Sequence, residues 1–122
     1  MYGGKVAKSQ ADMDMIHAHV MTRFEEHKPH VHRCYSSLAL DEIEDESLDW
    51  VYIDGNHAYE YVRDDLNGYI RKLVPGGLLT GDDYLWSPKQ KFPVKRAVNE
   101  MCTSGNVQVV DLDFRRFILR KT

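Results

Sequence analysis

The sequence predicts an α/β sandwich with a mainly parallel sheet, and three observations support this. Apolar runs at 48–54 and 77–82 read as strands, and each closes on acidic residues. The stretch 59–73 between them has the apolar spacing of an amphipathic helix. Strand, helix and strand at this spacing form a crossover unit whose two strands are parallel. Two further runs, at 107–112 and 114–120, surround a tight connection and predict a C-terminal antiparallel hairpin.

Length and composition fit one domain over residues 1–122. Of the 122 residues, 43% are hydrophobic and 29% are charged, as in ordinary globular proteins. The net charge of −3 favours neither nucleic acid nor an anionic membrane as a partner. No apolar run is long enough to span a bilayer, and the first ten residues lack the apolar core of a signal peptide. Cys34 and Cys102 form no CxxC motif, so we read both as packing residues and expect a cytoplasmic protein.

The first third of the chain is expected to supply one helix and one strand. Ser9 can cap a helix that begins near Gln10, and Lys28-Pro29 is expected to end it. The segment 30–36 reads as a short strand. The apolar face of the helix would comprise Met13, Ile16, Val20 and Phe24.

The middle of the chain is expected to form the centre of the sheet. The near-continuous apolar run Leu48–Ile53 suits a parallel strand that is buried on both faces. The helix Tyr59–Leu73 follows, and the Pro-Gly-Gly sequence at 75–77 stops it and turns the chain into the next strand. Pro93 can occupy the first turn of a further helix. The inner face of that helix would comprise Val94, Ala97, Val98 and Met101.

Four polar side chains are expected to meet where the two parallel strands end. Asp54 and His57 follow the first strand, and Asp82 and Asp83 follow the second. In open α/β sheets this edge is where ligands bind. Three carboxylates in one pocket repel one another unless a divalent cation such as magnesium, manganese or calcium neutralises them. Such a cation lowers the pKa of a bound hydroxyl, and a neutral imidazole at His57 can accept the hydroxyl proton.

Each of these residues also has a structural interpretation. Asp54 can cap the helix that follows it, and Asp83 can do the same for the next loop. His57 can be a hydrogen-bonded structural histidine at the start of a helix. Tyr84 and Trp86 can either pack in a lid or contact substrate. The sequence leaves these interpretations open.

Two motifs in the segment 48–84 are specific enough to suggest a family. The sequence DGNH at 54–57 fits D-G-x-H, and PGGLLTGDDY at 75–84 fits a P-G-G-x-x-x-G-D-D-Y block. Together they resemble the later half of a class I S-adenosylmethionine-dependent methyltransferase, in a group akin to catechol and sugar O-methyltransferases. The resemblance implies a Rossmann-like fold and the transfer of a methyl group to a hydroxyl of a small molecule or sugar.

The resemblance also implies roles for individual residues. In metal-dependent relatives, the acid that ends the fourth strand and the acid pair that ends the fifth bind magnesium. These positions match Asp54, Asp82 and Asp83, which are therefore the implied metal ligands. In some sugar-methylating relatives the histidine of D-x-x-H is the proposed base, which implies that His57 is catalytic.

The implied cofactor is S-adenosylmethionine, and the resemblance covers only part of its site. The end of the third strand often contacts the adenine, which implies a cofactor-binding role for Ser36 or Ser37. Family members begin with a strand and a glycine-rich E/D-x-G-x-x-x-G loop, and their next strand ends in an acid that binds the ribose. This sequence contains neither feature. We therefore expect a domain truncated at its N-terminus that binds the cofactor weakly on its own.

Two alternatives to a methyltransferase stay open. Loss of the glycine-rich loop favours a non-catalytic binding or assembly module, whereas retention of all three acids argues against it. A related metal-dependent enzyme, such as a hydroxylase-like member with the same acids, would need another cofactor or iron. No 2-His-1-carboxylate spacing is visible in the sequence.

An unpaired strand edge predicts self-association. In the family fold the first strand lies beside the strand equivalent to 48–54, and the truncated domain lacks it. An exposed edge is a template for pairing with another chain, so we expect a two-fold homodimer. In a local alternative, strand 30–36 moves beside 48–54 and covers the edge within one chain.

Overall fold

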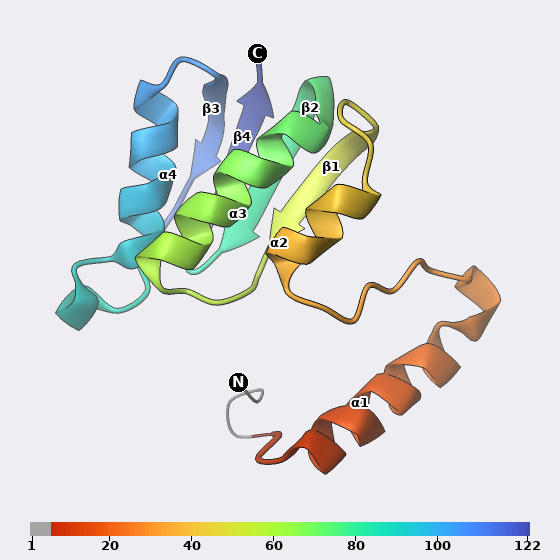
Figure 1. Ribbon diagram of the computed structural model, residues 1–122. Helices are drawn as coiled ribbons and strands as arrows, with labels where there is room; N and C mark the ends of the chain where they lie inside the picture. Colours follow the sequence, from red (N-terminus) through yellow and green to blue (C-terminus); the bar gives the residue numbers. More distant parts are fainter. Residues whose placement is uncertain (1–5) are drawn as a thin grey trace. The chain divides into compact units, whose positions relative to one another are not determined.

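The computed structural model describes residues 6–122, and the chain divides after Arg33 into two compact units, where the sequence predicts one domain. The first unit contains helix α1 (Gln10–Arg23) and a turn of 3-10 helix at Glu25–His27 (Figure 1). Ser9 caps α1 as expected, because its Oγ accepts a hydrogen bond of 3.2 Å from the backbone N–H of Asp12.

Helix α1 has no buried residue, although an apolar face was expected. Val20 is 40% exposed and Phe24 is 44% exposed. Helices in proteins owe most of their stability to tertiary packing of such a face. The hydrophobic core cluster described below consists of residues of the second unit.

The second unit is built on a four-stranded sheet whose order is β1-β2-β4-β3. β1 and β2 are parallel, whereas β4 pairs antiparallel with both β2 and β3. The α/β class, the parallel crossover unit and the C-terminal hairpin are thus confirmed. The described sheet is mixed rather than mainly parallel, because β4 returns between β2 and β3. The strands are β1 (Leu48–Ile53), β2 (Leu73–Asp82), β3 (Val107–Leu112) and β4 (Arg116–Lys121).

Two details of the predicted strands are wrong. Residues 30–35 form no strand, and the short helix α2 (Ser36–Ala39) begins where that strand was expected to end. A strand needs a neighbour to satisfy its backbone groups, and this segment has none in the described chain. β2 begins at Leu73, directly after helix α3, so the Pro-Gly-Gly sequence at 75–77 lies inside β2, where the pairing with β1 shifts register.

Helices cover one face of the sheet. Helices α3 (Tyr59–Lys72) and α4 (Pro93–Thr103) pack side by side on this face, with α2 beside α3 (Figure 1). On the opposite face, Trp50 of β1 is 60% exposed and Tyr52 is 48% exposed. Residues 34–122 therefore form two layers, and the second helical layer of the expected sandwich is not part of this unit.

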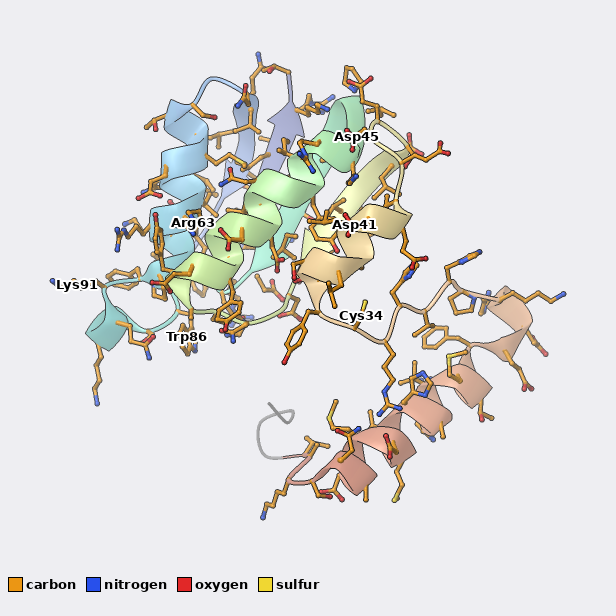
Figure 2. The ribbon with its side chains drawn as sticks, in the orientation of Figure 1. Cys34, Asp41, Asp45, Arg63, Trp86 and Lys91 are labelled. Carbon is orange, nitrogen blue, oxygen red and sulfur yellow. The ribbon has the colours of Figure 1, made fainter. Side chains whose placement is uncertain are left out.

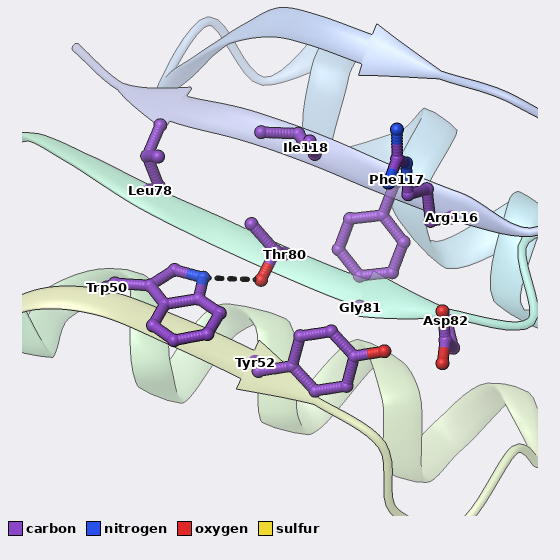
Figure 3. Close-up of a pocket in the computed structure, with 9 residues that line it drawn as sticks. All are labelled: Trp50, Tyr52, Leu78, Thr80, Gly81, Asp82, Arg116, Phe117 and Ile118. Atoms are coloured by element: carbon purple, nitrogen blue, oxygen red, sulfur yellow. Dashed lines mark hydrogen bonds between the residues drawn. The ribbon is translucent and has the colours of Figure 1, made fainter.

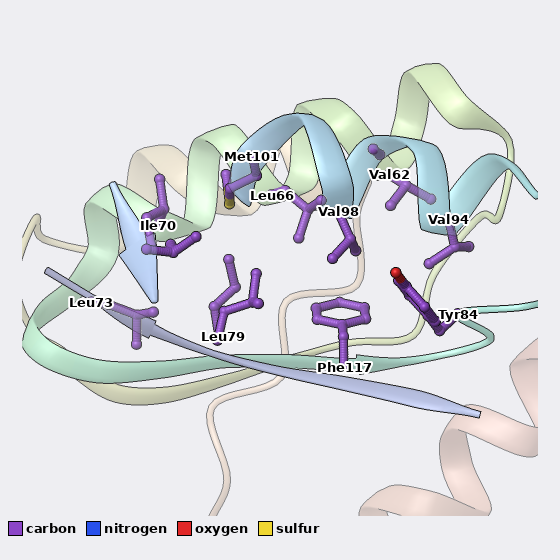
Figure 4. Packing of buried hydrophobic residues seen from close by; sticks show 13 residues of the cluster. Val62, Leu66, Ile70, Leu73, Leu79, Tyr84, Val94, Val98, Met101 and Phe117 are labelled. Atoms are coloured by element: carbon purple, nitrogen blue, oxygen red, sulfur yellow. The ribbon is translucent and has the colours of Figure 1, made fainter. Parts of the chain in front are cut away.

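The core lies between this helical layer and the sheet (Figure 4). Its centre is formed by side chains from both layers that are almost completely buried, namely Leu66, Leu73, Leu79, Val98, Phe117 and Leu119. The expected inner face of α4 is confirmed, because Val94, Ala97, Val98 and Met101 are all buried. Among residues 6–122, no helix has the length and apolar character needed to cross a membrane.

Candidate functional site

The ends of β1 and β2 bring the predicted site residues to one edge of the sheet. Ile53 pairs with Gly81, so Asp54 and Asp82 follow at the same level of the two parallel strands. Asp83 comes next and has a φ of 62°, a left-handed conformation that is uncommon for residues other than glycine. Such backbone conformations cost free energy and are frequent at functional sites.

Three of the four residues form a cluster, which we call the acid–histidine cluster: Asp54, His57 and Asp83. One ligand atom from each lies within 4.8 Å of the other two. His57 Nε2 lies 2.9 Å from Asp83 Oδ2 and 3.8 Å from Asp54 Oδ1. The Nε2 atom is shielded from solvent and forms no hydrogen bond among the described residues, although Asp83 Oδ2 lies 2.9 Å away.

The chemistry of this cluster fits a divalent cation. Two carboxylates and an imidazole nitrogen can accept hydrogen bonds or act as metal ligands. A buried nitrogen without a hydrogen-bond partner costs free energy. A cation between the carboxylates would neutralise them, with Nε2 either as a further ligand or as a free base beside the cation. The same arrangement also suits a base, since a carboxylate beside an imidazole can hold the ring in one orientation. The predicted neighbourhood of Asp54, His57 and Asp83 is therefore present in the structure.

Asp82 lies outside this cluster and belongs to a different environment. Its carboxylate accepts a hydrogen bond from the Tyr52 phenol, and this hydrogen bond is the largest of the causes that raise the pKa of Tyr52 to about 12. Figure 3 shows the Tyr52 hydroxyl directed toward Asp82 along the exposed face of the sheet. Both residues line a hollow of about 330 Å³ on that face, together with Trp50 and Arg116. Asp82 thus has a side-chain partner outside the cluster, while it also lines a hollow of about 360 Å³ together with Asp83 and Trp86.

The coupling between Asp82 and Tyr52 gives a direct prediction. Asp82→Asn removes the charge that disfavours the phenolate, so the pKa of Tyr52 should fall from about 12 toward its ordinary value of 10.0. The change would appear as an earlier step in the ultraviolet absorbance titration of the variant relative to the wild type. Asp113→Asn in the β3–β4 connection is the control and should leave the curve unchanged. Identical curves for all three proteins would show that this hydrogen bond is not formed.

The two serines differ in their surroundings. Ser36 Oγ donates a hydrogen bond of 2.6 Å to Asp65, and Tyr69 donates one of 2.8 Å to the Ser36 carbonyl. Ser36 also lines a hollow of about 310 Å³ that extends to Asp54. Burial raises the pKa of Asp65, and the Ser36 hydroxyl partly opposes this shift. Both serines are exposed, and only Ser36 lines that hollow, so Ser36 is the serine near the cluster.

Local structure distinguishes the capping and packing interpretations of three residues near the site. The N-cap of α3 is Ala58, so Asp54 does not cap this helix. Tyr84 is a core residue, which is 8% exposed and donates a hydrogen bond of 2.8 Å to Asn99. Trp86, in the loop after β2 (Figure 2), lies beside His57 with a distance of 5.1 Å between ring centroids. It therefore forms one wall of the acid–histidine cluster.

Sequence reasoning missed two participants, Tyr52 and Asp65. Tyr52 was read as part of a strand buried on both faces, although its place two residues before Asp54 could have signalled a contact with the site. Asp65 lies on the buried side of α3 and is 7% exposed. A carboxylate among the apolar positions of a helix indicates a polar partner, which here is Ser36.

Comparison with known proteins identifies the family. The family described as "Methyltransferase domain" matches residues 5–84, which is more than half of the chain. This chain belongs to the methyltransferase domain family. The match includes Asp54, His57, Asp82 and Asp83, so the candidate site lies within the matched part of this methyltransferase domain.

Solved structures share the fold of this domain at low sequence identity. A putative caffeoyl-CoA O-methyltransferase from Staphylococcus aureus has a TM-score of 0.71 and 13% identity, covering 94% of this chain and 62% of that protein. The O-methyltransferase NovP has a TM-score of 0.61 and 19% identity, covering 98% of this chain and 54% of NovP. A putative rRNA methylase from Clostridium thermocellum has a TM-score of 0.63 and 17% identity, covering 89% of this chain and 71% of that protein.

A curated relative matches a shorter segment. The uncharacterized protein y4gI from Sinorhizobium fredii is 42% identical over 45 residues, which are 37% of this chain and 5% of that protein. The chain also spans only 62% and 54% of the two O-methyltransferases. These solved methyltransferases therefore contain a substantial part that has no counterpart here.

Proposed function

We propose that this methyltransferase domain acts in S-adenosylmethionine-dependent transfer of a methyl group to a hydroxyl of a small molecule or sugar. The observation that carries the proposal is the acid–histidine cluster at the carboxyl ends of two adjacent parallel strands. Membership of the methyltransferase family and the fold shared with O-methyltransferases support it. A small polar substrate in the cytoplasm and no nucleic acid partner are part of the same proposal.

His57 is the proposed general base. Its Nε2 has no hydrogen-bond partner within residues 6–122 and lies at the sheet edge beside two carboxylates, where it can accept a proton from a substrate hydroxyl. The nearer carboxylate, Asp83, would hold the charged ring in place. Trp86 packs beside the imidazole and restricts its movement. Together these contacts would orient the base toward a hydroxyl at the sheet edge.

Asp54 and Asp83 are the proposed cation ligands, with Asp82 as a third ligand by resemblance to metal-dependent relatives. The first two already face one another in the cluster, and Asp82 would have to exchange its hydrogen bond with Tyr52 for the cation. When bound, a divalent cation lowers the pKa of a hydroxyl that it coordinates. His57 would accept the proton of the substrate hydroxyl, and the two carboxylates would hold the cation.

Titration with manganese tests the cation site. Because Mn²⁺ is paramagnetic, it should broaden the amide NMR signals of Asp54, His57 and Asp83 first. Signals from the β3–β4 hairpin edge at Val109 should be unaffected at the same concentration. If millimolar Mn²⁺ broadens no signal near the cluster, or broadens all acidic surfaces equally, the cation site does not exist.

S-adenosylmethionine is the proposed cofactor, and Ser36 is its proposed contact on this chain. We expect this chain alone to bind the cofactor poorly, because a glycine-rich loop and a ribose-binding acid make up much of a dinucleotide-like site. Ser37, also implied by the resemblance, does not line the hollow beside the cluster and would add little. Calorimetry with S-adenosylmethionine, with and without magnesium, measures the affinity of this chain for the cofactor. A micromolar Kd would contradict the expectation and indicate a complete cofactor site.

A second candidate is a non-catalytic binding or assembly module derived from a methyltransferase. The observation that favours it is the exposed sheet face with its two large aromatic side chains, Trp50 and Tyr52. The two proposals differ in their dependence on the acid–histidine cluster. A binding module would keep its partner after His57→Ala, whereas methyl transfer would be lost.

A further inference from the structure

The outer edge of β1 is open. β1 stands at the end of the sheet order, and no strand among the described residues pairs with its outer side. Its six residues include neither lysine nor proline, and Asp49 is its only charged residue. Natural edge strands are usually protected by such residues, by a bulge or by a covering segment. The expected local cover, a strand at 30–36, does not form.

The other edge strand, β3, is protected in a way that β1 is not. The register of β3 against β4 shifts between Val109 and Asp111, which leaves Val110 unpaired in a bulge. Bulges twist an edge and interrupt its hydrogen-bonding pattern. The pairing of β1 with β2 also shifts register, between Leu48 and Trp50, so an incoming strand finds a regular template at β1 over Trp50–Ile53.

Contacts with β2 show which backbone groups of β1 face outward. Thr80 Oγ1 of β2 donates a hydrogen bond of 2.8 Å to the carbonyl oxygen of Val51, so the backbone of Val51 faces β2. Backbone groups along a strand alternate in direction from one residue to the next. Trp50 and Tyr52 therefore direct their N–H and C=O groups away from β2, toward the open edge.

We propose that the occupant of this edge is a second copy of the chain, whose β1 pairs antiparallel with the first across a two-fold axis. The preferred register places Trp50 opposite Tyr52 of the second copy, and Val51 opposite itself. Each Trp50–Tyr52 pair joins two residues with outward backbone groups, so it can exchange two hydrogen bonds. The two pairs also place aromatic side chains opposite one another on the exposed face, a favourable cross-strand combination.

The charges of β1 are compatible with this register. Asp49 lies opposite Ile53 of the second copy rather than opposite itself, so no like charges meet. A two-fold axis makes the contact self-complementary and closed, because each copy offers the same edge to the other. The resulting dimer has one continuous sheet of eight strands, twice the four of a single copy. This proposal does not depend on the methyltransferase activity proposed above.

Mass and cross-linking test the dimer in the full chain. Light scattering at submillimolar concentration should give twice the monomer mass of 14.2 kDa. In a Cys34→Ser background, Val51→Cys should form a disulfide dimer under mild oxidation, since self-opposed residues at such a pair have Cα atoms about 4.5 Å apart. Val110→Cys on β3 is the matched control and should stay reduced. A monomeric mass, or equal cross-linking of the two variants, would overturn the proposal.

A charge exchange at the same position tests the register. Val51→Lys and Val51→Glu should each be monomeric, because like charges would face one another, and an equimolar mixture should regain the doubled mass. Circular dichroism of each variant checks that it is folded, and the Val51→Cys result stands if one is not. A dimer that persists in Val51→Lys would exclude this register. If the wild-type chain is monomeric but a strand of an unrelated polypeptide binds to this edge, the occupant is that polypeptide and not a second copy.

Discussion

Gly81→Ala should destabilise the protein by about 3 kcal/mol, the upper part of the usual range for overpacked cores. A Cβ at this position would lie 2.5 Å from the Ile53 carbonyl oxygen and 2.6 Å from Cζ of Phe117. The carbonyl oxygen belongs to the backbone of β1 and cannot move without disturbing the β1–β2 pairing. Phe117 is 1% exposed, so its ring is held by the core that surrounds it.

Urea denaturation followed by circular dichroism measures this effect. Gly55→Ala is the matched control at the end of the neighbouring strand, where the nearest atom to a new Cβ is Asp65 Oδ2 at 3.6 Å, an ordinary contact distance. Gly55 is not among the glycines with positive φ, so alanine should be tolerated there. Equal midpoints for the two variants would mean that β1 and Phe117 can move apart at little cost.

Asp83→Asn should weaken Mn²⁺ binding at least about tenfold, because it removes one of two carboxylates from the acid–histidine cluster. Asparagine is the appropriate substitution, since Asp83 has a φ of 62° and asparagine tolerates this conformation better than alanine. The loss of affinity would be measured from the Mn²⁺ concentration that broadens the signal of Asp54 by half.

Two further variants test which other side chains contribute to cation binding. Asp82→Asn should weaken Mn²⁺ binding less than Asp83→Asn does, since Asp82 is engaged by Tyr52. His57→Ala should leave cation binding largely intact if the histidine is a base, and should weaken it strongly if Nε2 is a ligand. Unchanged affinity in Asp83→Asn would remove the cluster as the cation site.

Much of the fold could be predicted because its signals are local. The crossover unit follows from apolar periodicity in β1, α3 and β2, and the buried face of α4 follows in the same way. The strand expected at 30–36 was wrong because strand formation depends on a distant pairing partner, which a seven-residue pattern cannot reveal. The position of β4 between β2 and β3 was not foreseen either, since it depends on pairing between strands that are distant in the sequence.

The candidate site could be predicted as a neighbourhood but not in its detail. Parallel strands had to bring Asp54 and Asp83 to one edge, and His57 is three residues from Asp54. The separation of Asp82 from Asp83 depends on the positive φ of Asp83 and on the direction of Tyr52. The sequence Asp82-Asp83 reveals neither the backbone conformation of Asp83 nor the direction of Tyr52. The assignment of Asp82 as a cation ligand therefore stays a prediction.

The sheet order has a consequence for how the protein is made on the ribosome. β4 follows β3 in the chain but occupies the position between β2 and β3 (Figure 1). The antiparallel half of the sheet therefore cannot assemble until Arg116–Lys121 has left the exit tunnel, and before that moment β2 has only β1 beside it. A nascent chain with an unpaired strand is prone to misassembly. In cotranslational folding, the β1–β2 pair should thus form first, and β3 should join the sheet only after β4 has emerged.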